Sequence, residues 1–206
     1  PHNPTGAVLS KEELGQIADF AKANNLLVVS DEAYDRLLYD GLEHRSIASE
    51  PGMRDRTVIL GSFSKTYSMT GWRIGYLAGP AEVIRGMALL QQSFVLSVNS
   101  FAQWGAVEAM TGPQDCVEEM RQQFDIRRKA MMEALSTIPN VSFAAPKGAF
   151  YIYLNHEKTG LDPVRFCAKL LDEYYVACVP GSEYGPYAGC NTRLSCATGL
   201  DDCLEG

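Results

Sequence analysis

Three short apolar runs constrain the fold of this chain more than any other feature. They lie at 26–30, 57–60 and 74–78, and small or polar residues follow each of them. Apolar runs of this length, bounded by turn-forming residues, are typical of buried strands whose two faces are covered by helices. We therefore expect an α/β fold built on a mainly parallel sheet flanked by helices.

Helical patterns precede and follow these runs. Ser10 and Glu13 have the spacing of a capping box, which marks the start of an amphipathic helix over 11–24. Further helices are expected over 81–92 and 99–111. Alternation of such helices with the apolar runs is the pattern of one large α/β domain.

The rest of the chain has a different pattern. After Gly112-Pro113 we expect a long charged helix over 113–138. The shorter elements that follow are strands within 141–154, at 176–179 and at 192–196, and a helix over 162–175. This is a smaller α+β domain. The predicted division is therefore a large domain at 1–115 and a small C-terminal domain at 116–206.

The two ends of the sequence suggest a fragment. The chain opens at Pro1 without an initiator Met, and Asp201–Gly206 resemble a helix cut after its first turn. We therefore expect the small domain to be truncated at its end.

Composition argues against several classes of partner. The net charge of -7 and the pI near 5.0 do not suit nucleic acid or an anionic membrane. No apolar run reaches the roughly 18 residues that a membrane span needs. The six cysteines form no CxxC pair and only three histidines accompany them, so no metal site is expected. Scattered reduced thiols are typical of a cytoplasmic protein.

Candidate catalytic residues follow the first two apolar runs. Lys65 lies in a turn of small residues just past the second run, where ligands bind in open α/β sheets. A lysine there is a candidate Schiff-base nucleophile, and the alternative is a solvated loop lysine. Asp31 follows the first run directly and needs a cationic partner there, unless it caps a helix.

Other polar residues cluster near Lys65 in the sequence. Arg73 suits bidentate contact with a phosphate, and Ser62 and Ser64 offer hydroxyl donors to the same group. Tyr34 lies three residues after Asp31 and can face the same site, although a packed aromatic residue explains it equally well. Each residue has a structural alternative, but together they call for one explanation.

Four motifs resemble those of the class I/II aminotransferases of fold type I. Ser62–Thr66 with Gly71–Gly75 is similar to the lysine motif of that family. Pro1–Gly6 resembles its asparagine motif, Asp31–Tyr34 its aspartate–tyrosine motif, and Thr192–Ser195 its carboxylate-binding arginine motif. The motifs occur in the family's order and the resemblance covers the whole chain.

The resemblance implies pyridoxal 5'-phosphate as cofactor and a role for each matched residue. Lys65 would form the Schiff base, and Asp31 would pair with the pyridine nitrogen. Asn3 and Tyr34 would hydrogen-bond the 3-oxygen of the cofactor. The phosphate would be held by Ser62, Ser64 and Arg73. The substrate would be held by Arg193, which clamps its α-carboxylate, together with Asn3.

The implied activity is ping-pong transfer of an amino group from an L-amino acid to a 2-oxo acid, in a homodimer. The sequence does not identify the amino-acid substrate. One family branch binds the distal carboxylate of a dicarboxylic substrate through an arginine between the positions of Arg85 and Arg121, and no Lys or Arg lies there in this chain. Two alternatives also remain. One is a carbon–sulfur lyase on the same fold, and the other is a cofactor-sensing domain of a transcription regulator.

Overall fold

The computed structural model describes residues 1–205 and divides the chain into two compact units. The unit that contains Lys65, here the lysine unit, comprises Leu9–Arg36 and Glu43–Glu118. The unit that contains Arg193, here the arginine unit, comprises Pro1–Val8, Leu37–Leu42 and Glu119–Gly206. Compared with the division at residue 115 predicted from the sequence, the arginine unit also includes two earlier segments.

The lysine unit contains a three-stranded sheet and four α-helices. Its strands are β1 (Val28–Asp31), β2 (Thr57–Ser62) and β3 (Gly75–Ala78). Its α-helices are α1 (Lys11–Ala23), α2 (Phe63–Thr66), α3 (Ala81–Val95) and α4 (Ser100–Thr111). Three 3-10 helices lie between them, η1 (Ile47–Ser49), η2 (Arg54–Arg56) and η3 (Thr70–Trp72). The expected α/β class is confirmed.

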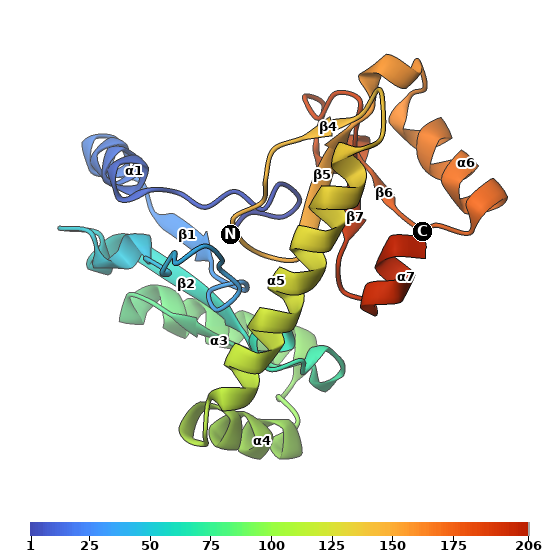
Figure 1. The fold of residues 1–206 in the computed structure, drawn as a ribbon. Coiled ribbons are helices and arrows are strands. Elements are labelled where there is room, and N and C mark those ends of the chain that lie inside the picture. The colour runs from blue at the N-terminus through green and yellow to red at the C-terminus, as the bar shows by residue number, and fades with distance from the viewer. Residues whose placement is uncertain (206) are drawn as a thin grey trace. The chain divides into compact units, whose positions relative to one another are not determined.

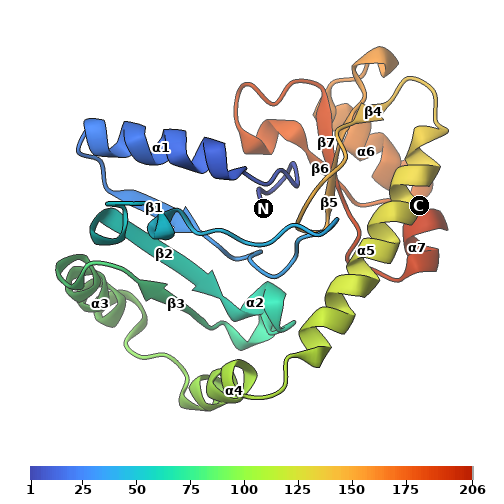
Figure 2. The same cartoon turned by 60° about the vertical axis from the view of Figure 1, so that its left-hand side comes forward.

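The sheet is mixed within the described residues rather than mainly parallel. Its order is β1-β2-β3, with β1 parallel to β2 and β2 antiparallel to β3. The antiparallel pairing has a local cause, because only the one-turn helix α2 and the 3-10 helix η3 connect β2 to β3. A parallel return needs a longer crossover, usually a full helix. Figure 2 shows β1, β2 and β3 side by side, with α2 at the tip of β2.

The α1 helix starts as the sequence predicts. The Ser10 hydroxyl accepts a hydrogen bond from the Glu13 backbone N–H at 3.2 Å, and the Glu13 carboxylate accepts one from the Ser10 N–H at 2.7 Å. The inner face of α1 carries Leu14, Ala18 and Ala21, which pack with η1 and with Met53. This core covers one face of β1, because Val28 packs against it.

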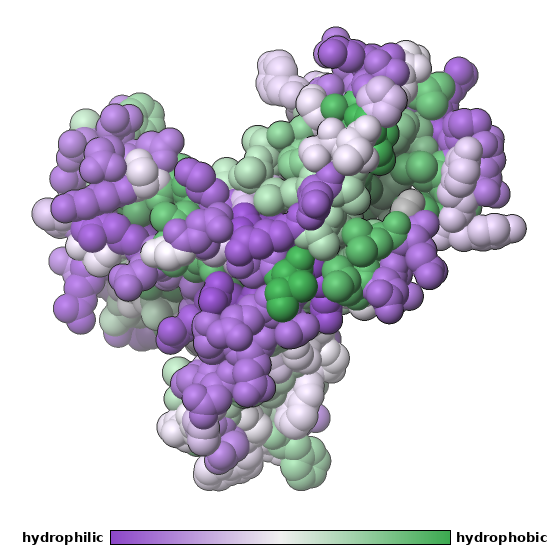
Figure 3. All heavy atoms as spheres, viewed as in Figure 1, coloured by the Kyte–Doolittle hydropathy of each residue, from purple (hydrophilic) through white to green (hydrophobic). Residues whose placement is uncertain are grey.

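The expectation that these strands are buried on both faces is wrong for the described structure. Val29 on β1 is 57% exposed and Leu77 on β3 is 40% exposed, and no residue of α3 is buried. A second cluster buries Phe63, Met69 and Ile74 beneath α4. The described elements therefore cover only part of the sheet, and Figure 3 shows green apolar patches at the molecular surface among purple polar ones.

The arginine unit is an antiparallel sheet with helices. Its strands are β4 (Ser142–Phe143), β5 (Tyr151–Asn155), β6 (Val179–Pro180) and β7 (Asn191–Ser195), in the order β4-β5-β7-β6. Its helices are α5 (Asp115–Ser136, whose first turn belongs to the lysine unit), α6 (Pro163–Tyr174) and α7 (Leu200–Glu205). Two 3-10 helices are η4 (Glu157–Thr159) and η5 (Gly181–Tyr184). Figure 1 shows β5 and β7 side by side in this unit.

The two faces of this sheet differ in chemistry. Side chains alternate between faces along a strand, and paired residues share a face. Ile152 pairs with Leu194, and Leu154 pairs with Thr192, so these four residues share the apolar face. The hydroxyl of Thr192 lies 3.5 Å from the Cys167 sulfur on α6, which places this face toward the helices. The opposite face carries Arg193, which pairs with Tyr153.

The N-terminal segment is fastened to the arginine unit by a tight turn. The Gly6 carbonyl accepts hydrogen bonds from the N–H groups of Lys147 at 2.9 Å and Gly148 at 3.0 Å. Gly6 has φ +67°, and a Cβ there would lie 2.3 Å from the Pro146 Cβ. Only glycine fits this position, because both the backbone angle and the space exclude a side chain. The turn fixes the segment that carries Asn3.

A buried ion network fastens Leu37–Leu42 to the same unit. Arg128 on α5 is 3% exposed, and its Nη2 lies 2.8 Å from an Asp40 carboxylate oxygen and 2.6 Å from one of Asp125. Its guanidinium also lies over the Tyr39 ring at 4.6 Å.

Among residues 1–205, no helix is both long and apolar enough to cross a membrane.

Candidate active site

Two predicted site residues lie at one edge and on one face of the sheet of the lysine unit. Because β1 and β2 are parallel, their carboxyl ends meet at the same edge. Asp31 pairs with Leu60, and Ser62 lies two residues further along β2. The period of two puts the Asp31 and Ser62 side chains on the same face.

Lys65 lies within the short helix α2, which follows β2 directly. The Ser62 hydroxyl caps this helix by accepting a hydrogen bond from the Ser64 N–H at 3.2 Å. Lys65 is half-buried, in the turn that leaves the carboxyl end of β2. The structure thus places Lys65 within three residues of Ser62, at the strand end where the sequence predicts a ligand.

A hydrogen bond joins α2 to the loop that follows β1. Thr66, the residue after Lys65, is buried, and its hydroxyl donates to the Asp35 carboxylate at 2.9 Å. Asp35 lies in the same loop as Tyr34, which is half-buried. The bond fixes the lysine turn relative to the aspartate–tyrosine loop. The loop that carries the aspartate–tyrosine motif is therefore in contact, through Asp35, with the lysine motif.

The three carboxylates of this loop differ in their partners. Glu32 accepts hydrogen bonds from Ser30 at 3.0 Å and from Ser46, and lies 2.9 Å from the His44 ring. Burial raises the pKa of Glu32, but the bonds from His44, Ser46 and Ser30 outweigh it and hold the pKa below its usual range.

Asp31 is the carboxylate without a side-chain partner. One of its oxygens accepts a hydrogen bond from the Ala33 N–H at 3.1 Å. Within residues 1–205, no cationic side chain pairs with it. Glu32 and Asp35 are committed to structural contacts, whereas Asp31 is available to a cation that binds at this edge.

Arg73 and Ser64 are linked through the connection between α2 and β3. Arg73 is exposed, has a left-handed backbone (φ +54°), and donates from Nη1 to the Thr70 carbonyl at 3.0 Å. The Thr70 hydroxyl donates in turn to the Ser64 carbonyl at 3.0 Å. The connection returns to the sheet at Gly75, which pairs with Ser62. Ser62, Ser64 and Arg73 therefore belong to one hydrogen-bonded loop.

The arginine unit brings Arg193 and Asn3 together. Arg193 donates from Nη1 to the Asn3 side-chain oxygen at 2.8 Å. Its guanidinium lies over the rings of Tyr151 at 4.3 Å and Tyr184 at 5.4 Å. Its Nε is buried and has no hydrogen-bond partner among the described residues. A buried donor without an acceptor is costly, so the site fits an incoming anion.

Sequence reasoning predicted Arg193 and Asn3 but not the tyrosines around them. Tyr151 carries a recognisable signal, because it lies on a strand at a position that shares a face with Arg193. Tyr184 carries none, since it comes from η5 after a turn whose course the sequence does not specify. The Thr66–Asp35 bond was missed for the same reason, because it joins residues that are 31 apart in the chain.

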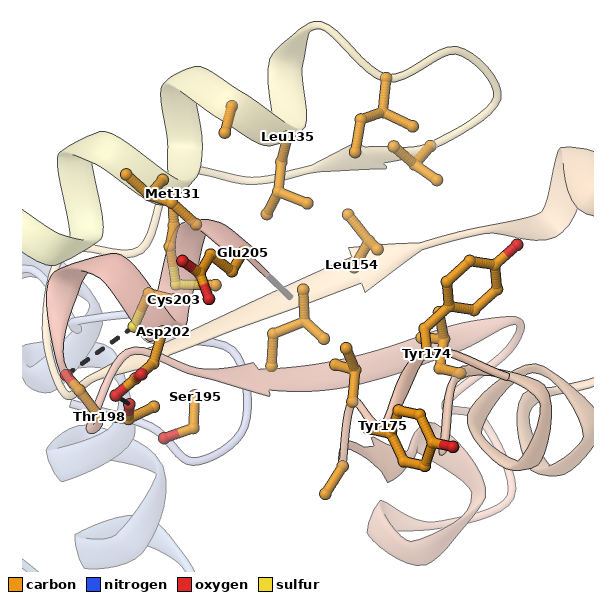
Figure 4. A pocket seen from close by; sticks show the side chains of 18 of the residues that line it. Met131, Leu135, Leu154, Tyr174, Tyr175, Ser195, Thr198, Asp202, Cys203 and Glu205 are labelled. Carbon is orange, nitrogen blue, oxygen red and sulfur yellow. Dashed lines mark hydrogen bonds between the residues drawn. The ribbon is translucent and has the colours of Figure 1, made fainter. Parts of the chain in front are cut away.

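A large cavity lies away from these residues. It has a volume of about 760 Å³, and most of its lining is apolar. Its walls come from α5, α6, α7 and the apolar face of β5 and β7, with Met131, Leu135 and Leu154 labelled in Figure 4. None of the predicted site residues lines it. The cavity and the predicted site residues therefore do not coincide.

The chain has close relatives among known proteins. It is 44% identical to an aspartate aminotransferase of Bacillus sp. (strain YM-2), over 98% of this chain and 52% of the relative. It is 40% identical to an aromatic-amino-acid aminotransferase of Thermococcus litoralis, over 100% of this chain and 53% of the relative. The chain thus spans about half the length of these relatives.

Solved structures give the same result. The aromatic aminotransferase of Pyrococcus horikoshii OT3 matches with a TM-score of 0.95 and 42% identity, covering 100% of this chain and 55% of that one. A Thermus thermophilus aspartate aminotransferase variant matches with a TM-score of 0.90 and 38% identity, covering 100% and 53%. The family model of class I and II aminotransferases matches residues 1–205. This chain therefore belongs to the class I and II aminotransferase family.

Proposed function

We propose that this chain carries the lysine-bearing part of a pyridoxal-phosphate aminotransferase. The enzyme would transfer the amino group of an L-amino acid to a 2-oxo acid in two half-reactions. The observation that carries the proposal is the meeting of Asp31, Ser62 and Lys65 at the shared carboxyl edge of β1 and β2. Membership of the aminotransferase family supports the same reading.

The residues at this edge fit the chemistry of the cofactor. A primary amine, Lys65, suits its aldehyde, and the loop of Ser62, Ser64 and Arg73 offers hydroxyl and guanidinium donors that suit its phosphate. Asp31, which has no cationic side-chain partner in the described chain, suits its protonated ring nitrogen. When bound, pyridoxal phosphate takes up the electron pair that is left when the Cα–H bond of an amino acid breaks.

The chain's own residues would supply the proton transfers and the orientation. Lys65 would hold the cofactor through Nζ. As a free amine, Nζ would take the proton from the substrate Cα and deliver it, in the same half-reaction, to the cofactor carbon that comes from the aldehyde. The Asp31 carboxylate would keep a proton on the ring nitrogen, and Asn3 and Tyr34 would hydrogen-bond the cofactor's 3-oxygen.

Arg193 would bind the α-carboxylate of the substrate. Its buried Nε lacks an acceptor among the described residues, and a carboxylate oxygen would satisfy it. Related chains are named for aspartate and for aromatic amino acids. Because the α-carboxylate is common to both, the proposal extends to L-α-amino acids as a class.

The proposal includes a cytoplasmic homodimer. All six cysteines are free, as expected for a reducing compartment. Large apolar side chains on α3 and α4 are exposed, including Phe94, Phe101 and Trp104. Exposed apolar surface of this kind is typical of an interface with another protein chain.

Borohydride reduction and peptide mapping test the role of Lys65. The protein that contains this chain is loaded with pyridoxal phosphate, reduced and digested, and the pyridoxyl group should be found on Lys65. The same preparation should form a 2-oxo acid from an amino acid only when a second 2-oxo acid is present. A label on another lysine would overturn the assignment, and release of pyruvate with ammonia would indicate a lyase.

A further inference from the structure

Arg193 is held in the middle of its sheet. It lies on β7 between two neighbouring strands, paired with Tyr153 on β5 and with Val179 on β6. Backbone pairing on both sides leaves little freedom to the Cα position of Arg193. What remains to be fixed is the long side chain and the orientation of its guanidinium.

The guanidinium is held entirely by uncharged groups. Asn3 accepts one hydrogen bond, and the rings of Tyr151 and Tyr184 lie at 4.3 Å and 5.4 Å from the guanidinium carbon. Within residues 1–205 no carboxylate forms an ion pair with Arg193. Arg128 in the same unit provides the contrast, because Asp40 and Asp125 neutralise it.

This difference in partners has an electrostatic consequence. A carboxylate partner would orient the guanidinium but would also cancel its charge and compete with an incoming anion. An aromatic face attracts a cation through its quadrupole and leaves the net positive charge in place. The Tyr184 phenol stays neutral near pH 7, because burial raises its pKa even though Arg193 opposes this. The rings thus orient the cation without neutralising it.

Each ring is itself held in place. Tyr151 is buried and contacts the Phe150 ring at 4.7 Å, which stacks on Phe124 of α5 at 5.1 Å. Tyr184 meets the Tyr153 ring edge-on at 6.2 Å. The 3-10 helix that ends at Tyr184 packs closely, since a Cβ on Gly181 would lie 2.7 Å from the Tyr153 hydroxyl oxygen.

We propose that Tyr151 and Tyr184 are positioning residues that set the guanidinium of Arg193 for carboxylate binding. Asn3 alone cannot do this, because it engages one N–H of the five that a guanidinium carries. Two ring faces restrict the side chain further and so reduce the entropy that is lost when a carboxylate binds. The inference rests on the proposed role of Arg193 as the α-carboxylate site.

Tyr184→Leu and Tyr184→Phe form the test pair in the protein that contains this chain. The Leu variant removes the ring, whereas the Phe variant keeps the ring and removes only the hydroxyl. The measurements are KM and kcat for an L-amino acid, and the dissociation constant of 3-phenylpropionate, a carboxylate without an amino group. We expect the Leu variant to raise KM and the dissociation constant about 3- to 30-fold with kcat nearly unchanged. The Phe variant should stay within about twofold of the parent.

Arg193→Lys separates this inference from the proposed function. If that variant leaves 3-phenylpropionate binding unchanged, Arg193 is not the carboxylate site and the proposed role fails. If it weakens binding but Tyr184→Leu does not, only the ring inference is overturned. Equal losses in the Leu and Phe variants would also overturn it, because the hydroxyl would then be responsible. Should Tyr184→Leu fail to fold, Tyr184→Met fills the space without an aromatic face and is expected to behave as the Leu variant.

Discussion

At the scale of single residues, the loop after β1 distributes three carboxylates among different tasks. Glu32 and Asp35 accept hydrogen bonds from side chains of the lysine unit, whereas Asp31 accepts only a backbone N–H. Their sequence positions do not distinguish them, since all three follow the same apolar run. The partners in the structure do, and they leave Asp31 as the group able to meet a bound cation.

Asp31→Asn tests this distinction. Asparagine keeps the size and the bond to the Ala33 N–H but removes the charge that would hold a proton on the cofactor ring. We expect cofactor affinity to fall only modestly and the rate of Cα-proton removal to fall about 10²- to 10³-fold. Stopped-flow single-turnover kinetics with a deuterated substrate measure that rate. A near-normal rate would show that Asp31 has another task.

At the scale of elements, the contact between α2 and the loop after β1 fixes the position of Lys65. Thr66→Val removes the hydroxyl but keeps the shape, so the Asp35 carboxylate loses its donor inside a half-buried loop. The expected loss is about 1–3 kcal/mol in the free energy of unfolding, measured by urea denaturation. Thr66→Ser is the matched control and should recover most of it. Equal stability of the Val variant and the parent would contradict the assigned bond.

The Glu32 cluster ties the loop between β1 and β2 to the sheet edge, and its strength depends on pH. The folded-state pKa of Glu32 lies below its ordinary value of 4.5. A lowered pKa contributes stability that is fully present above pH 4.5 and is lost as the pH falls through the folded value. Glu32→Gln should therefore reduce the acid dependence of thermal unfolding below about pH 4.5. An unchanged pH profile would exclude this linkage.

Local sequence signals predicted some elements well and others only in part. The Ser10–Glu13 capping box defines the start of α1, because all of its partners lie within four residues. The antiparallel direction of β3 was missed, since three similar apolar runs do not reveal how they are connected. Around Arg193, the motif identified the arginine, but the approach of Tyr184 depends on a turn with no local signature.

At the scale of the whole molecule, exposed apolar surface is the main departure from the sequence-based expectation. The apolar runs that form β1, β2 and β3 indicate burial, yet Val29 and Leu77 remain open to solvent. A sequence pattern indicates which side chains require burial but not which elements provide it. The relatives are about twice as long as this chain, so they have further residues with which such faces can be covered.

Residues 1–206 expressed alone should therefore self-associate and fail to catalyse sustained amino transfer. Apolar side chains are exposed on β1, on β3 and on α3, where Phe94 is 82% exposed. Exposed apolar surface of this extent favours self-association of a monomer. The open sheet edge adds unpaired backbone groups. Light scattering with size exclusion should detect association, and a 2-oxo acid assay with added pyridoxal phosphate should detect no turnover. The double variant Val29→Thr and Leu77→Thr, with two apolar side chains made polar, should stay monomeric to a higher concentration. A monodisperse, active monomer of the parent chain would contradict this account of its surface.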